Sequence, residues 1–81
     1  MIDLPYSLTI EATEEPNYFS FYSTELEGFT GSGGSIEDCL HQAQLGMKEH
    51  VELLIEHGLP VPPTNPDPLV SIRNEPKDAA A

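Results

Sequence analysis

The sequence has little of what catalytic, metal-binding and nucleic-acid-binding proteins usually carry. Its 81 residues include one cysteine, no tryptophan and three basic residues against fourteen acidic ones, a net charge of −11. A single cysteine excludes an intramolecular disulfide, and no Cys/His cluster suggests a structural zinc site. Coulomb repulsion from phosphates opposes direct nucleic-acid binding. We therefore expect no cofactor, no metal site and no nucleic-acid partner.

Long apolar runs are also missing, so we expect no membrane partner. The N-terminus lacks the basic and then apolar pattern of a secretory signal, which leads us to expect a cytoplasmic protein. Hydrophobic residues make up 38% of the chain and aromatic residues 7%, enough for a small core. Because apolar burial and ordering entropy nearly cancel at this size, we expect self-association into a dimer or tetramer.

One long helix is predicted from Ile36 to His57, and the rest of the chain is organised around it. Ser35 is the predicted N-cap, with Asp38 reaching back as in a capping box. Gly58 is predicted to take a positive φ after the helix, and Pro60 prevents the helix from continuing. Apolar residues at steps of three and four share one face: Ile36, Leu40, Ala43, Met47, Val51, Leu54 and Ile55.

Four other stretches have the composition of strands. Residues 6–12 alternate apolar and polar side chains, with Tyr6, Leu8, Ile10 and Ala12 predicted to face the helix, and residues 18–23 are aromatic. Residues 29–33 form a short strand weakened by glycine. A proline-rich connector at 59–68 then leads to a short strand at 69–73.

The connections between these stretches complete the predicted fold. Residues 13–17 are typical of a hairpin loop, Gly28 is predicted to take a positive φ in a turn, and Gly33 turns the chain into the helix. The class is α+β in the order β-β-β-α-β: a three-stranded antiparallel sheet, one long helix and a short C-terminal strand. We expect one domain at 1–73 and a disordered tail at 74–81.

Two tyrosines form a candidate self-association surface. Phe19 and Phe21 suit the core, whereas Tyr18 and Tyr22 share the opposite face of the strand with Ser20. An aromatic second face on a small sheet is typical of a partner or dimer surface. Amphipathic tyrosines lying on the surface explain the pattern equally well, so both interpretations stay open.

Several patterns invite a catalytic interpretation, and none is sufficient. The glycine-rich run at 31–35 lacks the lysine of a P-loop. Cys39 has no suitably placed base, because His41 points to a different helix face. His50 and His57 are seven residues apart, too far for the pair of a zinc helix. A nuclease would need several convergent carboxylates to hold divalent ions. We predict a protein that is not an enzyme.

A run of residues from the turn into the helix carries a family resemblance. It consists of Glu25-Leu26-Glu27-Gly28-Phe29, then Gly33, then Ser35-Ile36-Glu37-Asp38, then Ala43, and the helix exit Gly58-Leu59-Pro60-Val61-Pro62-Pro63 follows. With the aromatic strand before the turn, this order resembles the HicB-like antitoxin family, the partner half of HicAB type II toxin–antitoxin pairs. Many members add a C-terminal DNA-binding domain, and this chain ends soon after the last predicted strand. The resemblance is therefore to a single-domain form, and operator binding is not implied.

The resemblance implies a fold, a partner and a function. The fold is a trimmed ribonuclease-H-like sheet with one helix, which usually self-associates. The partner is a small basic RNA-cleaving toxin of the HicA type, whose active surface the antitoxin blocks. The carboxylates predicted to meet it are Glu11, Glu14, Glu15, Glu25 and Glu27. The alternatives are a solitary oligomeric HicB-like module that binds another protein or ligand, and a relic nuclease.

Overall fold

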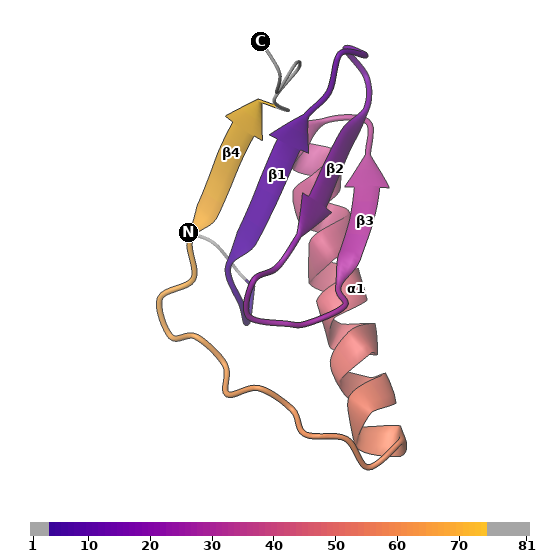
Figure 1. The fold of residues 1–81 in the computed structure, drawn as a ribbon, viewed down its shortest axis with the longest axis vertical. Coiled ribbons are helices and arrows are strands. Elements are labelled where there is room, and N and C mark those ends of the chain that lie inside the picture. The colour runs from indigo at the N-terminus through magenta and orange to yellow at the C-terminus, as the bar shows by residue number, and fades with distance from the viewer. Residues whose placement is uncertain (1–3, 75–81) are drawn as a thin grey trace, which may run out of the picture.

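A four-stranded sheet with one helix on one of its faces forms the fold (Figure 1). The computed structural model describes residues 4–74. The strands are β1 (Leu8–Ala12), β2 (Phe19–Tyr22), β3 (Thr30–Gly33) and β4 (Val70–Asn74), and the helix α1 (Ile36–Glu56) precedes β4. The α+β class and the order β-β-β-α-β are as predicted.

The sheet has the strand order β3-β2-β1-β4. β1, β2 and β3 pair antiparallel, as predicted, whereas β4 pairs parallel with β1. The sheet is therefore mixed and four-stranded, which the prediction of a three-stranded sheet plus a separate short strand did not specify. The parallel pairing arises because α1 and the connector carry the chain back to the end of the sheet where β1 begins (Figure 1).

Both ends of α1 are fixed by local hydrogen bonds. The Ser35 side chain accepts a hydrogen bond from the Asp38 backbone N–H at 3.0 Å, which confirms the predicted N-cap. Asp38 accepts from the backbone N–H of Gly34, one residue before the position a capping box uses. At the other end Gly58 has φ +68°, as predicted. The amides of Gly58 and Leu59 donate to the carbonyls of Ile55 and Leu54, the pattern of a Schellman motif.

The core lies between the sheet and α1. Leu8, Ile10 and Phe21 are almost fully buried there, as the strand alternation predicted. Phe21 lies between Ile10 and Gly31 in the sheet register. A Cβ atom at Gly31 would come within 2.5 Å of the Phe21 ring, so the ring occupies the space above this glycine. The remaining buried apolar residues are Leu4, Tyr6, Leu26, Phe29, Cys39, Ala43 and Met47.

Several predicted boundaries differ from the structure by one or two residues: β2 ends at Tyr22, β3 begins at Thr30, α1 ends at Glu56 and β4 begins at Val70. β1 begins at Leu8 rather than at Tyr6, yet Tyr6 is fully buried and its hydroxyl donates to the Pro62 carbonyl at 2.7 Å. β2 begins after Tyr18. Asn74 was assigned to the tail but ends β4, because it continues the pairing of this strand with β1. The rest of the predicted tail, residues 75–81, lies outside the described part of the chain.

The helix is longer than the sheet that it covers. Its 21 residues span about 31 Å, whereas strands of four or five residues span about 16 Å. The last turns of α1 therefore project beyond the sheet, as Figure 1 shows. Ile55, predicted on the buried face, is 65% exposed for this reason, and Leu53 is 53% exposed.

Candidate protein-binding surface

The five carboxylates predicted to bind a partner lie at different places on the sheet. Glu14 and Glu15 are exposed in the loop that joins β1 to β2. Glu25 and Glu27 are exposed in the loop that joins β2 to β3, at the opposite end of the sheet (Figure 1). Glu11 lies within β1 between these ends. The structure therefore brings Glu25 and Glu27 together and separates them from Glu14 and Glu15.

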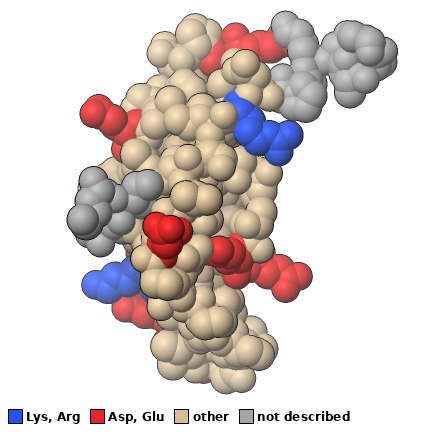
Figure 2. Space-filling view, turned by 90° about the vertical axis from the view of Figure 1, so that its left-hand side faces the viewer, with Lys and Arg blue, Asp and Glu red and all other residues tan. Residues whose placement is uncertain are grey.

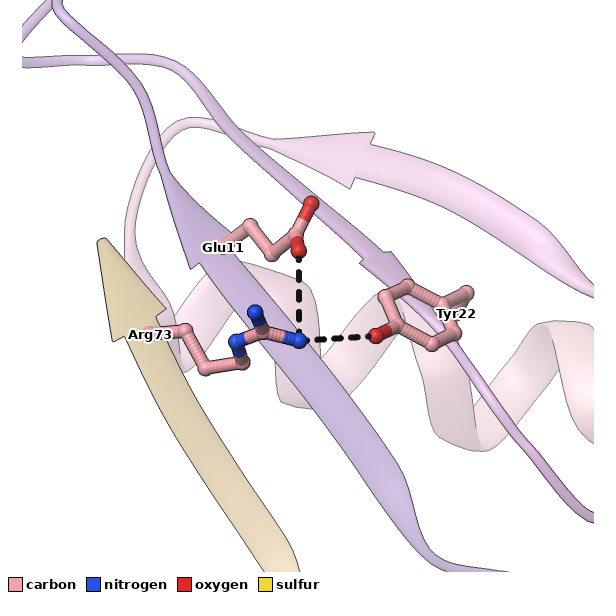
Figure 3. A network of polar contacts seen from close by, with 3 residues as sticks. All are labelled: Glu11, Tyr22 and Arg73. Atoms are coloured by element: carbon pink, nitrogen blue, oxygen red, sulfur yellow. Dashed lines mark hydrogen bonds and ion pairs between the residues drawn. The ribbon is translucent and has the colours of Figure 1, made fainter. Parts of the chain in front are cut away.

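Glu11 belongs to a small polar network on the sheet face that α1 leaves open. Its carboxylate lies 3.9 Å from the guanidinium of Arg73, which also donates to the Tyr22 hydroxyl at 3.4 Å (Figure 3). Arg73 is 54% exposed, so solvent screens the pair and its contribution to stability is small. The guanidinium of Arg73 nevertheless partly neutralises the charge of Glu11.

Glu25 has a structural role that its position in the sequence did not reveal. One carboxylate oxygen accepts from the Ser7 backbone N–H and the other from the Asn65 side-chain amide, both at 2.8 Å. Asn65 also donates its backbone N–H to the Pro5 carbonyl. Glu25 therefore ties the connector to the segment before β1, and both its oxygens are engaged.

Glu27 lies between two clefts at this end of the sheet. The first is apolar, has a volume of about 630 Å³ and is lined by Leu26, Leu54, Glu27 and the helix exit Leu59–Pro63. The second is more polar and lies between the β2–β3 loop and the start of β3, with Glu25, Glu27 and Pro62 in its lining. Among the described residues, no lysine or arginine lines either cleft.

The exit of α1 borders the apolar cleft. Leu59 is 53% exposed beside the apolar cleft, next to Val61. A third cleft is separate from these two: it is lined by Leu53, Glu49, Glu52 and Glu56, which lie on the helix face turned away from Leu54. We call the two clefts at Glu27, lined by residues 22–30, Leu54 and residues 59–63, the loop-end surface. Exposed apolar side chains rimmed by carboxylates are its distinguishing feature, and such patches are typical of interaction sites.

The loop-end surface was only partly predictable. Glu25 and Glu27 were among the predicted residues, whereas the lining prolines and the exposed Leu59 were not. A signal for them was present, because the helix predicted from the sequence is about 33 Å long and the longest predicted strand only about 23 Å. The residues at its end could not all face the sheet.

The two tyrosines predicted for self-association have different environments. Tyr18 lies just before β2 and is 48% exposed. Tyr22 is half-buried on the open sheet face, where its hydroxyl accepts from Arg73. Tyr18 thus remains available for a contact with another molecule, while Tyr22 already has one within the chain.

The turn glycines predicted from the sequence have structural roles. Gly28 has φ +84°, and Phe29 beside it donates its N–H to the Leu26 carbonyl in a tight turn. Gly33 ends β3 where a Cβ atom would lie 3.0 Å from the Cys39 sulfur. A side chain at Gly33 would therefore press against the first turn of α1.

The groups considered for catalysis are not assembled into a reactive site. Cys39 is fully buried, and burial together with the nearby Asp38 carboxylate raises the pKa of its thiol, so the neutral form is favoured. His50 packs edge-on against the Phe29 ring, with the centroids 6.0 Å apart. Within residues 4–74, no group of three or more His, Cys, Asp or Glu side chains is placed to hold a metal ion.

Comparison with protein-family models, with curated proteins and with solved structures gave no match to this chain. In the part of the chain that the structure describes, the helix lacks the long apolar stretch that crossing a bilayer requires.

Proposed function

We propose that this chain is a non-catalytic HicB-like antitoxin domain that binds and neutralises a small basic RNA-cleaving toxin of the HicA type. The observation that supports it most is the loop-end surface, where the exposed Glu27 lies between an apolar cleft and a more polar one and no lysine or arginine lines either cleft among the described residues. The order β-β-β-α-β and the mixed sheet with one helix are consistent with the family resemblance in the sequence.

The chemistry of such a surface suits a partner that binds RNA. A protein that binds RNA presents cationic side chains for the phosphates, and the carboxylates of this domain can pair with them instead. Opposite net charges speed the encounter, and burial of apolar side chains such as Leu59 then adds affinity that salt does not screen. Occupying the cationic face of the toxin would prevent RNA from reaching it.

A solitary oligomeric HicB-like module is the second candidate, in which the chain binds copies of itself and another protein or ligand. The exposed Tyr18 beside β2 and the exposed Ile72 of β4 favour it, because both leave apolar area on the surface of the monomer. A relic nuclease remains the least supported alternative, and metal-dependent RNA cleavage by the pure protein would reveal it.

Inhibition of RNA cleavage tests the proposal. A small basic protein captured with the domain should cleave RNA when alone and should be silenced by an equimolar amount of the domain. Glu27→Lys should raise the concentration for half-inhibition about tenfold, because it puts a cation at the junction of the two clefts. Asp67→Lys is the matched control, with the same change of charge at an exposed residue that lines none of these clefts.

The hairpin carboxylates are tested separately. If Glu14 and Glu15 also meet the toxin, their double change to Lys should slow association at low salt. An association rate equal to that of the wild type would remove this pair from the binding surface. Failure of the unchanged domain to inhibit its basic partner would contradict the proposed function itself.

A further inference from the structure

The outer side of β4 is an open sheet edge. β4 is the last strand in the sheet order, and among residues 4–74 nothing pairs with its outer side. The Leu69 carbonyl accepts from the Leu8 amide and so points toward β1. Because successive residues of a strand alternate in direction, Ser71 and Arg73 also turn toward β1. The N–H and C=O groups of Val70, Ile72 and Asn74 are therefore presented outward.

This edge carries exposed apolar side chains. Ile72 is 55% exposed and Leu69, just before the strand, is 64% exposed. Ile72 is in register with buried Ile10 and so lies on the helix side of the sheet. However, in the described part of the chain α1 packs against β1, β2 and β3 and does not reach β4. β4 also lacks the proline, lysine or bulge by which edge strands usually avoid pairing with other chains, and its one charged side chain, Arg73, is directed at Glu11 and Tyr22.

The opposite edge is different. Two of the four residues of β3 are glycines, and its exposed side chains are those of Thr30 and Ser32. α1 makes its closest approach to the sheet along β3, which covers the apolar side of that edge. Of the two edges, β4 is therefore the one with apolar area to bury.

We propose that β4 pairs antiparallel with β4 of a second copy, about a two-fold axis that passes beside Ile72. Such an interface is self-complementary and closed. In this register Ile72 lies opposite Ile72 of the second copy, and Val70 lies opposite Asn74 at both ends. All of these residues present their N–H and C=O groups outward, so each facing pair exchanges two backbone hydrogen bonds. The two sheets become one, with both helices on the same face.

Charge selects both the edge and the register. Each copy carries a net charge of −11, but residues 69–74 contain no carboxylate, and Figure 2, which views the molecule from the β4 side, shows mostly uncharged surface. In the proposed register Arg73 lies opposite Ser71 of the second copy. A shift by two residues toward the C-terminus would place Arg73 opposite Arg73, and like charges directly opposite are destabilising. A shift the other way would place Pro68, which has no N–H, within the ladder.

The size and charge of this interface predict its behaviour. Two paired five-residue strands form a small interface compared with the roughly 1,200–2,000 Å² that stable interfaces bury, so we expect a weak dimer. Salt should strengthen it, because it screens the repulsion between two acidic copies. A complex with a basic toxin should weaken with salt. The dimer does not depend on the proposed function, and the opposite salt dependence separates the two.

Sedimentation velocity of the full chain tests the proposal. The sedimentation coefficient should rise with protein concentration, and the dissociation constant of the dimer should fall as NaCl is added. Ile72→Lys should raise that constant about tenfold or more, because two lysines then face each other at the axis. Ser32→Lys on the β3 edge is the matched control and should leave the dimer intact. A protein that is monomeric up to about 1 mM, or a dimer that Ile72→Lys leaves unchanged, would overturn the proposal.

Disulfide cross-linking tests the register. In a hydrogen-bonded antiparallel pair the Cα atoms lie about 5.5 Å apart, within the range of a disulfide. Ile72→Cys should therefore form a covalent dimer under mild oxidation. Ser71→Cys should not, because residue 71 lies opposite residue 73. The native Cys39 is buried and provides no competing link. Equal cross-linking of the two variants would overturn the register.

Discussion

At the scale of single residues, glutamates at different positions have different roles. Glu25 and Glu27 are two residues apart in one loop. Glu25 is engaged by Ser7 and Asn65, whereas Glu27 lies between two clefts. The sequence motif that contains both gives no indication of this difference, because the partners of Glu25 are 18 and 40 residues away. A charge-reversal experiment on this loop is informative at Glu27 and would damage the fold at Glu25.

Ser35 gives a direct test of the helix start. Its hydroxyl accepts from the Asp38 amide at 3.0 Å, and Ser35→Ala leaves that amide without its partner. We expect the free energy of unfolding, measured by urea denaturation, to fall by about 1 kcal/mol. Ser32→Ala removes a hydroxyl from an exposed strand position and should change the free energy of unfolding by less than about 0.5 kcal/mol. Equal losses in the two variants would show that Ser35 does not act as a cap.

At the scale of elements, the connector between α1 and β4 decides the topology. It is attached at two points before β4 begins: Tyr6 donates to the Pro62 carbonyl, and Asn65 bonds to Glu25. Ser7 then accepts from the Leu69 amide, next to the first residue of β4. These bonds place β4 beside β1 and so create the open edge.

Asn65→Asp should loosen this attachment in a pH-dependent way. The substitution replaces the amide that donates to Glu25 at 2.8 Å by a second carboxylate, and the unfolding free energy should fall by about 1–2 kcal/mol at pH 7. The neighbouring carboxylate would raise the pKa of the introduced Asp above its unfolded value. The loss of unfolding free energy should therefore be full when the pH is above that raised pKa, and it should diminish as the pH falls through that pKa.

The control for this prediction is Asn17→Asp, the same change at an exposed residue of the β1–β2 loop. Asn17→Asp should have little effect on the unfolding free energy at pH 7 or at pH 4.5. If urea denaturation at pH 7 and pH 4.5 gives the same loss for Asn65→Asp at both values, repulsion from Glu25 is not its cause.

Local features of this fold were predictable and distant ones were not. The cap at Ser35, the positive φ at Gly28 and Gly58, and the burial of Leu8 and Ile10 follow from neighbouring residues. The parallel pairing of β4 and the attachment of Glu25 to Asn65 depend on contacts between distant parts of the chain. The exposure of Ile55 depends on the length of the sheet relative to the helix. For the binding surface, composition predicted an acidic partner-binding protein, and only the structure separated the carboxylates into two groups.

At the scale of the whole molecule, charge is the dominant property. A chain of −11 attracts basic partners and repels its own copies. The two proposed contacts therefore lie on different parts of the surface: a basic toxin at the acidic loop-end surface, and a second copy at the β4 edge without carboxylates. Because they do not overlap, a dimer could bind two toxin molecules.

The central claim is that this domain binds a small basic RNA-cleaving protein. The most direct measurement is affinity capture from the native lysate with the whole chain as bait, at low and at high salt, with mass spectrometry of the bound proteins. We predict one small basic protein, retained at low salt, lost progressively as NaCl rises, and able to cleave RNA once released. Recovery of this chain alone at every salt concentration would contradict the claim and favour the solitary oligomeric module.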